Sequence, residues 1–225
     1  MADPVLVFRP EPGNARTGEA LRELDFTPIL YPLYTAEALA WTPPLPAEID
    51  AILLTSANAA RLGGPGLSRF AHLPVFAVGE ATAKAAGEAG FRAVETGGGD
   101  AASTVPLIAA AGHHHVLHFG GQDMRSYDPH GLTITRLPVY RMAERGDAAG
   151  LARALPRDRG VYGLVHSPRA GERLAALLSP GDRHRMSIVA ISETASDACG
   201  AGWRQRIFVG LPTEAAMLAG LQMLV

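Results

Sequence analysis

Short apolar runs alternate with helix-like segments along most of the chain. The runs lie at residues 5–8, 51–54, 75–78, 116–119, 161–165 and 188–191, and most of them lead into Gly, Ser or Thr before a segment with apolar residues at helical spacing. Strands that are apolar on both faces and alternate with helices are typical of parallel sheets covered on both sides. The pattern therefore predicts an α/β protein with doubly wound parallel sheets.

Four stretches depart from this alternation. Residues 27–33 contain two prolines, which exclude a helix, and residues 132–140 are also predicted to be extended. The proline-rich stretch 36–48 reads as a connection, and the polar stretch 143–149 reads as a joint between two halves of the pattern.

The pattern repeats. Ser56 and Ser167, each just after an apolar run, lie 111 residues apart, and Thr82 and Thr194, each near the start of a later helix, lie 112 apart. The order of strands, corners and helices is the same in both stretches. A repeat of this length indicates two duplicated units rather than a solenoid.

The second copy of the pattern, after residue 149, has no counterparts of the last two strands of the first copy. The N-terminal segment supplies them. The segment 5–34 matches 116–140, with Pro-Leu-Tyr ending at Tyr34 and Pro-Val-Tyr ending at Tyr140. We therefore predict a discontinuous domain, 1–34 plus 142–225, and a continuous one, 36–140. The chain would cross between them twice, and the two crossings could pair as a two-stranded hinge.

Composition narrows the class of protein. The chain has 225 residues, is 48% hydrophobic and carries a net charge of −2, so it can bury large cores and has no basic surface that suits nucleic acid. Its single cysteine, Cys199, excludes an internal disulfide and fits a reducing compartment. With no apolar run of membrane-spanning length and no signal-like start, we expect a cytoplasmic protein without a membrane partner.

Several short motifs occur together in a characteristic order. They are Arg9-Pro10, the stretch 54–58 (Leu-Thr-Ser-Ala-Asn), the stretch 77–83 (Ala-Val-Gly-Glu-Ala-Thr-Ala), Gly120-Gly121, Val139-Tyr140, 166–168 (His-Ser-Pro) and 190–194 (Ala-Ile-Ser-Glu-Thr). With this order and spacing, the chain resembles the uroporphyrinogen-III synthase family over nearly its whole length.

The resemblance implies both a fold and a reaction. Members of this family have two α/β domains joined by a two-stranded connection. They take a linear hydroxymethylbilane, invert its terminal pyrrole ring and close the macrocycle with loss of water, as lyases of tetrapyrrole biosynthesis that leads to haem, sirohaem and cobalamin. They use no metal or organic cofactor. The expected partners are this small-molecule tetrapyrrole and the upstream bilane-forming enzyme, and we expect a monomer.

The family's substrate carries eight carboxylates, and a protein of net charge −2 cannot attract it through its overall charge. Hydrogen-bond donors and cations placed at the site must bind it instead. Helix N-termini, hydroxyls and arginines at the carboxyl ends of parallel strands can supply them. The resemblance points to Tyr140 as the catalytic hydroxyl, since a neutral phenol can donate to the leaving oxygen. The predicted substrate-binding residues are Arg9, Ser56, Ala57, Asn58, Gly79, Thr82, Gly120, Gly121, Arg125, Ser167, Pro168, Arg169, Ser192, Thr194, Pro212 and Thr213.

Each of these residues can also have a purely structural role. The Ser and Thr residues can be helix caps alone, the arginines can be solvated, and Tyr140 can pack like Tyr34. The segment 192–194 departs from the family pattern: Ser192 stands where the family prefers Gly, and Thr194 lies one residue earlier than the spacing in the first repeat predicts. It therefore stays open which of these two hydroxyls binds substrate. The consecutive residues His113-His114-His115 point in alternating directions, so we expect no metal site.

Two other functions compete with the enzyme. One is a hinged two-domain protein that binds a polycarboxylate without catalysis. The other is a nucleotide-dependent transferase, which the lack of a G-x-G-x-x-G or Walker pattern disfavours.

Overall fold

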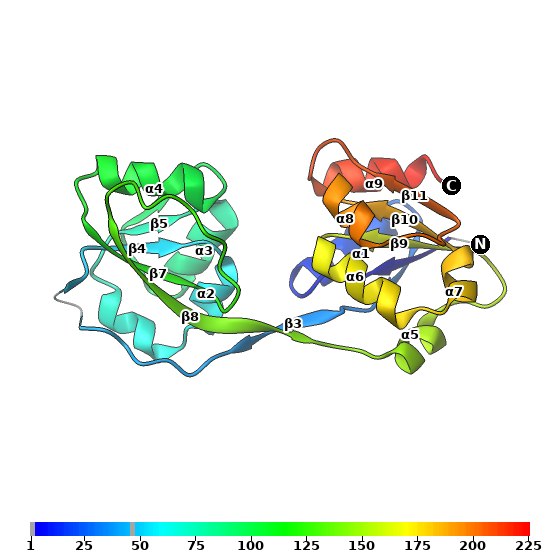
Figure 1. Ribbon diagram of the computed structural model, residues 1–225, viewed down its shortest axis with the longest axis horizontal. Helices are drawn as coiled ribbons and strands as arrows, with labels where there is room; N and C mark the ends of the chain where they lie inside the picture. The colour runs from blue at the N-terminus through cyan, green and yellow to red at the C-terminus, as the bar shows by residue number, and fades with distance from the viewer. Residues whose placement is uncertain (1–2, 46–47) are drawn as a thin grey trace. The chain divides into compact units, whose positions relative to one another are not determined.

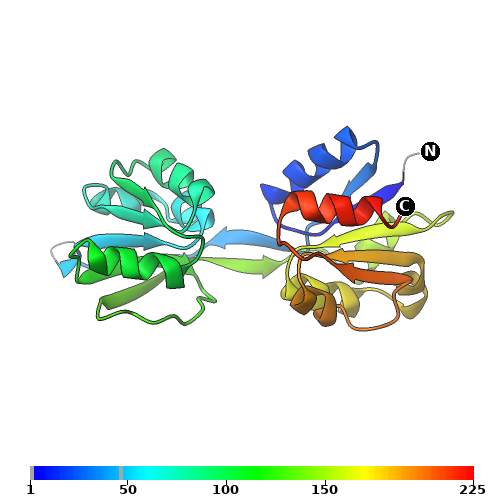
Figure 2. The ribbon, with the colours of Figure 1, turned by 90° about the horizontal axis from the view of Figure 1, so that it is seen from above.

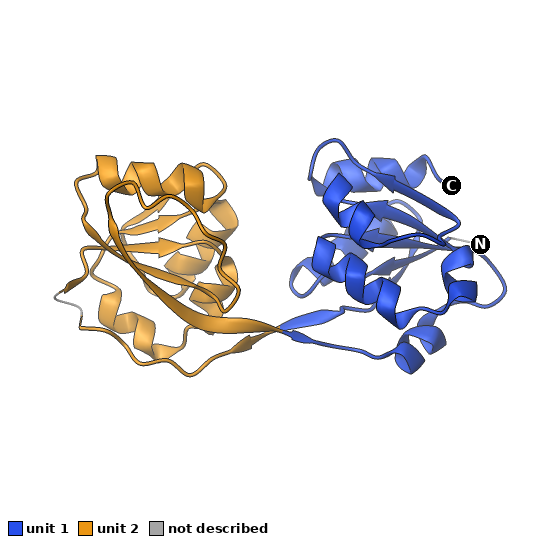
Figure 3. Ribbon diagram, viewed as in Figure 1, with its two compact units in different colours: residues 1–35, 143–225 blue, residues 36–142 orange. Residues whose placement is uncertain are grey.

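The computed structural model describes residues 3–45 and 48–225. Contacts within the chain divide it into two compact units (Figure 3): unit 1 is Met1–Thr35 with Ala143–Val225, and unit 2 is Ala36–Met142. Each unit contains a predominantly parallel sheet with helices on both faces. The predicted α/β fold class is therefore confirmed.

Unit 2 is built on a six-stranded sheet in the order β3-β8-β7-β4-β5-β6 (Figure 1). The elements are β3 (Tyr34–Ala38), β4 (Ala51–Leu54), α2 (Ala57–Leu62), the 3-10 helix η2 (Pro65–Phe70), β5 (Val75–Ala77), α3 (Glu80–Glu88), β6 (Val94–Thr96), α4 (Ala101–Ala110), β7 (His115–Gly121) and β8 (Thr133–Glu144). Strands β4 to β8 pair with one another in parallel.

Unit 1 is built on a five-stranded parallel sheet in the order β11-β10-β9-β1-β2. Its elements are β1 (Pro4–Val7), α1 (Gly13–Glu23), β2 (Thr27–Leu30), α5 (Ala148–Ala154), β9 (Val161–Val165), α6 (Pro168–Leu177), α7 (Pro180–Arg185), β10 (Met186–Ala190), α8 (Glu193–Ala198), β11 (Gln205–Phe208) and α9 (Glu214–Gln222).

The two sheets share one strand order, as the repeat in the sequence indicated. Strands β9, β10 and β11 occupy the places of β4, β5 and β6, while β1 and β2 occupy those of β7 and β8. The N-terminal segment thus completes the second copy of the pattern. Since parallel strands end at one edge of a sheet, the corners that follow them gather at the carboxyl edge of each unit.

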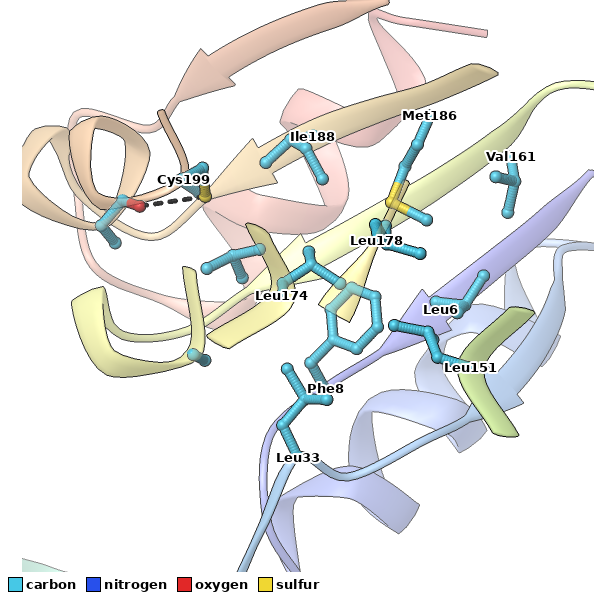
Figure 4. Close-up of a cluster of buried hydrophobic side chains, with 14 of the residues drawn as sticks. Leu6, Phe8, Leu33, Leu151, Val161, Leu174, Leu178, Met186, Ile188 and Cys199 are labelled. Atoms are coloured by element: carbon cyan, nitrogen blue, oxygen red, sulfur yellow. Dashed lines mark hydrogen bonds between the residues drawn. The ribbon is translucent and has the colours of Figure 1, made fainter. Parts of the chain in front are cut away.

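The core of unit 1 has two layers. On one face of the sheet, Phe8 and Met186 pack with Leu174 of α6 and Cys199, whose thiol donates a hydrogen bond to the Ala195 carbonyl at 3.2 Å (Figure 4). Burial raises the pKa of this thiol to about 11, so it is a packed thiol rather than a nucleophile. Helices α1 and α9 cover the other face (Figure 2).

The core of unit 2 also has two layers, one on each face of the sheet. Helices α2, α3 and η2 cover one face, where Phe119 makes edge-on contacts with Phe70 and Trp41 at ring-centroid distances of 5.7 and 5.3 Å. Helix α4 covers the other face through Val105 and Ile108. The central strands β4 and β5 are buried and apolar on both faces.

Some local predictions were wrong. The stretch 36–48 was expected to be a connection, yet β3 extends into it as far as Ala38, and residues 46–47 lie outside the described part of the chain. Strand β8 continues to Glu144, and α5 begins soon after it, so 143–149 is not a simple joint. The Asp147 side chain caps α5 by accepting from the Gly150 N–H at 2.6 Å. Neither η2 nor α7 was expected.

Candidate functional site

A cavity of about 370 Å³ opens at the carboxyl edge of the unit 2 sheet. Its lining comes from the ends of β4, β5, β7 and β8, the start of α4 and the loop after β7: Thr55, Val78, Gly99, Asp100, Ala101, Ala102, His118, Gly121, Asp123, Met124, Arg125, Ser126, Tyr127 and Tyr140. Three predicted site residues, Gly121, Arg125 and Tyr140, come together here. The cavity is large enough for a ligand group of modest size.

The glycine pair at the end of β7 makes room for the side chains around it. The pairing of β7 with β8 is irregular at Gly120 and Gly121, where Gly121 lies opposite Tyr140. A Cβ on Gly121 would come within 2.9 Å of the Tyr140 ring, and one on Gly120 within 2.6 Å of the Met124 sulfur. The glycines are therefore required by space and not by an unusual φ angle.

The phenol of Tyr140 is half-buried, and its ring packs against the core of unit 2. Within residues 3–45 and 48–225, its hydroxyl has no hydrogen-bond partner. Its counterpart Tyr34 differs, since the Tyr34 hydroxyl donates to the Arg169 carbonyl at 3.4 Å. Of the two equivalent tyrosines, Tyr140 is the one with a hydroxyl free to donate.

A hydrogen-bonded chain that the sequence reasoning missed also reaches the cavity. His118, 1% exposed, lies with Nε2 2.8 Å from the Thr55 hydroxyl and Nδ1 2.8 Å from the Tyr127 hydroxyl. Burial, reinforced by the positive charge of Arg136, lowers the pKa of His118 to about 4. The signal in the sequence is one histidine within the apolar run 116–119.

The other predicted residues of unit 2 lie outside the cavity lining: Gly120 is in β7, and the rest are at or near helix starts. Ser56 caps α2 by accepting from the Asn58 N–H at 3.2 Å, and Ala57 is the first residue of that helix. Gly79 precedes α3, which begins at Glu80. Thr82 is 6% exposed and lies inside the helix, so little of its surface remains for a ligand.

In unit 1 the predicted hydroxyls serve as helix caps. Ser167, Ser192 and Thr213 each accept a hydrogen bond of 3.2 Å from the backbone N–H three residues later. Pro168 is the first residue of α6, and Pro212 precedes the cap of α9. The exposed Thr194 lies 3.0 Å from Ser192, oxygen to oxygen. Capping uses an oxygen lone pair and leaves the hydroxyl protons of Ser167 and Thr213 available, whereas the contact between Ser192 and Thr194 uses one of their two protons.

Arg9, predicted to bind a substrate carboxylate, is paired within unit 1. Its guanidinium lies 2.6 Å from the Glu214 carboxylate, and His166 Nε2 lies 3.7 Å from the same oxygen. Burial alone would raise the pKa of Glu214, but contacts with His166 and Thr17 and the charge of Arg9 lower it to about 2. Glu214 therefore stays ionised and holds Arg9.

Arg169 occupies the second position of α6, where its guanidinium carbon lies 5.8 Å from the centre of the Tyr34 ring. This arrangement is a cation–π contact. Arg125, in contrast, is an exposed member of the cavity lining. Of the three predicted arginines, Arg125 is the one that lines the same cavity as Tyr140.

The run of three histidines is anchored through its backbone. The N–H groups of His114 and His115 donate to Asp50 at 2.8 and 3.1 Å, and the His113 ring packs edge-on to Phe76. The described ranges contain no group of three His, Cys, Asp or Glu side chains placed to hold a metal ion. Every helix in those ranges is too short or too polar to span a lipid bilayer.

Comparisons with known proteins agree with this architecture. The family model described as uroporphyrinogen-III synthase HemD matches residues 15–219. The crystal structure of uroporphyrinogen-III synthetase from Helicobacter pylori superposes with a TM-score of 0.72 at 16% identity, covering 100% of both chains. A mutant uroporphyrinogen III synthase from Thermus thermophilus gives a TM-score of 0.52 at 18% identity, covering 99% of this chain and 98% of that one. No curated protein matches the sequence.

Proposed function

The chain belongs to the uroporphyrinogen-III synthase family, and from this membership we propose how its own residues carry the reaction. It is an enzyme that acts on a small-molecule tetrapyrrole, the linear hydroxymethylbilane, and closes it into the macrocycle with inversion of one ring. Because the reaction eliminates water from the substrate, we class the enzyme as a hydro-lyase.

Tyr140 is the donor to the leaving hydroxyl. The observation that carries this assignment is a phenol whose hydroxyl has no partner among the described residues and which lines a cavity at the carboxyl edge of a parallel sheet. A hydrogen bond to the departing oxygen stabilises the negative charge that develops there, while the cavity wall shields the cation left behind from water.

Charged and backbone donors hold the carboxylates of the substrate. Arg125 lines the same cavity as Tyr140, and so do Ala101 and Ala102 at the start of α4. A helix N-terminus contributes about 0.3–1 kcal/mol per bound anion, so several donors must act together. The helix starts at Ser56, Ser167, Ser192 and Thr213 remain predicted contacts, each through a hydroxyl proton and the first amides of its helix.

Catalysis comes mainly from holding a flexible chain in one geometry. Bringing two ends of one molecule together replaces a large entropic barrier by binding energy. Gly121 fixes the place of the Tyr140 phenol, which lets a single weak acid act at one point. This view requires that loss of the phenol slows the reaction without stopping it.

We also propose that the protein is cytoplasmic and monomeric, and that it receives the bilane from the enzyme that forms it. The buried thiol of Cys199 suits a reducing compartment. Size-exclusion chromatography of the protein, alone and with the bilane-forming enzyme, tests the last two points.

The function is tested by giving the purified protein linear hydroxymethylbilane and separating the type III and type I isomers of the macrocycle. We expect the type III isomer, with heat-denatured protein as the control. Type I alone would contradict the assignment. Binding of the bilane without any turnover would instead favour the non-catalytic polycarboxylate-binding protein.

A further inference from the structure

The hydrogen-bonded series Thr55–His118–Tyr127 includes a second phenol, that of Tyr127, in the cavity that Tyr140 lines. His118 bridges Thr55, at the end of β4, and Tyr127, in the loop after β7, with two contacts of 2.8 Å. All three residues line the same cavity as Tyr140. Tyr127 and Tyr140 therefore line one cavity of about 370 Å³.

The surroundings of His118 keep its imidazole neutral. Its neighbours in strand register are Leu53 of β4 and Arg136 of β8. Burial disfavours the imidazolium, and the cation at Arg136 disfavours it further, so the pKa is about 4. A neutral imidazole has one N–H donor and one lone-pair acceptor, and therefore it cannot donate to both hydroxyls.

One of the two neutral tautomers leaves the Tyr127 O–H available to a ligand. The Arg136 guanidinium carbon lies 4.6 Å from the centre of the Tyr127 ring. Burial raises the pKa of Tyr127, and the charge of Arg136 opposes that rise. In the tautomer that leaves this O–H available, the proton is on His118 Nδ1, which donates to the Tyr127 oxygen, while Nε2 accepts from the Thr55 hydroxyl. The Tyr127 O–H then points away from His118 and is free for a ligand.

We propose that Tyr127 is a second hydroxyl donor to the leaving oxygen of the bilane, and that His118 is the positioning residue that orients it. A hydroxyl oxygen has two lone pairs and accepts two hydrogen bonds, one from Tyr140 and one from Tyr127. The inference rests on the proposed function and deepens it. It gives a structural reason for residual activity after loss of either phenol.

The test measures kcat for type III formation in Tyr127→Phe, Tyr140→Phe and the double variant. Each single change should lower kcat about 10-fold, because one donor remains. The double variant should lose about 1,000-fold, more than the product of the single effects, because no donor remains. KM should change little, since the contact forms at the leaving group.

The role of His118 is tested by combining substitutions at His118 and Tyr127. In a folded protein, His118→Leu should lower kcat about as much as Tyr127→Phe, about 10-fold, and should add nothing in a Tyr127→Phe background. His118→Asn should retain more kcat than His118→Leu, because its amide can still donate toward Tyr127. If His118→Leu fails to fold, Thr55→Val replaces it. A His118 effect that persists undiminished in the Tyr127→Phe background would overturn the positioning role.

Tyr162→Phe is the matched control, because its hydroxyl donates to the Leu224 carbonyl at 3.2 Å in unit 1, outside this cavity. It should leave kcat unchanged. A wild-type protein that makes no type III isomer would overturn the proposed function together with this inference. A wild-type protein that makes it, with a double variant no slower than Tyr140→Phe, would overturn the role of Tyr127 alone.

Discussion

Gly121 lies directly against the phenol of Tyr140: a methyl group on its Cα would come within 2.9 Å of the ring carbon Cζ and 3.1 Å of the hydroxyl oxygen. Any side chain at this position would push the ring out of place. The glycine therefore fixes where the hydroxyl enters the cavity, although it takes no part in the chemistry itself.

Gly121→Ala should accordingly lower the rate of type III formation about 10- to 100-fold, because small displacements of a catalytic group are costly. Gly87→Ala is the matched control, since a Cβ there meets no atom within 4 Å and Gly87 lies inside α3. We expect the control to be fully active and slightly more stable. Equal activity of both variants would show that the position of the Tyr140 ring does not matter.

Arg125 and Arg9 should behave differently when neutralised. Arg125→Gln removes a cation from the cavity lining and should raise KM about 10-fold with little loss of stability. Arg9→Gln breaks the ion pair with Glu214 and should cost about 1 kcal/mol of unfolding free energy, with a smaller change in KM. Steady-state kinetics and urea unfolding of both variants measure this contrast. A larger KM effect at Arg9 than at Arg125 would contradict this contrast and favour Arg9 as a substrate ligand.

Ser167 allows helix capping to be separated from substrate binding. Ser167→Ala removes the acceptor for the Ala170 N–H and should destabilise unit 1 by about 1 kcal/mol. Ser167→Asp keeps the cap but adds a negative charge, so it should preserve stability while raising KM for a polyanionic substrate. Unchanged KM in the Asp variant would mean that Ser167 is only a cap.

The buried His118 predicts a pH dependence of stability. Its pKa in the folded protein, about 4, lies below the ordinary 6.5, so the unfolded state binds the proton more readily. The free energy of unfolding should therefore fall as the pH drops from about 6.5 toward 4, by up to about 3 kcal/mol from this group. Urea unfolding of wild type and His118→Asn across this range isolates the contribution. Parallel curves for the two proteins would contradict the buried, neutral imidazole.

The fold was predictable because its signals are local and repeated. Apolar runs specified the parallel strands, and the spacing between Ser56 and Ser167 related one sheet to the other. What was missed depends on partners distant in the sequence. Strand β3 pairs with β8, where the Leu39 N–H donates to the Val139 carbonyl at 2.9 Å, and nothing in 36–48 alone signals that contact. The role of the two crossings as a hinge stays a prediction.

The site was only partly predictable for the same reason. Strand ends and helix starts locate Gly121, Arg125 and Tyr140 at one edge, because topology alone fixes that edge. His118 looks like a core residue in the sequence, since one of its partners is 63 positions away. The ion pair that occupies Arg9 joins residues 205 positions apart, so no local pattern could reveal it.

The central claim is that the Tyr140 hydroxyl donates to the leaving group while positioning supplies most of the catalysis. Its most direct test is the rate of type III formation by Tyr140→Phe, measured beside wild type on protein whose thermal unfolding is unchanged. We predict a rate about 10-fold lower that is still clearly measurable. An unchanged rate, or the loss of all turnover in the folded variant, would contradict it.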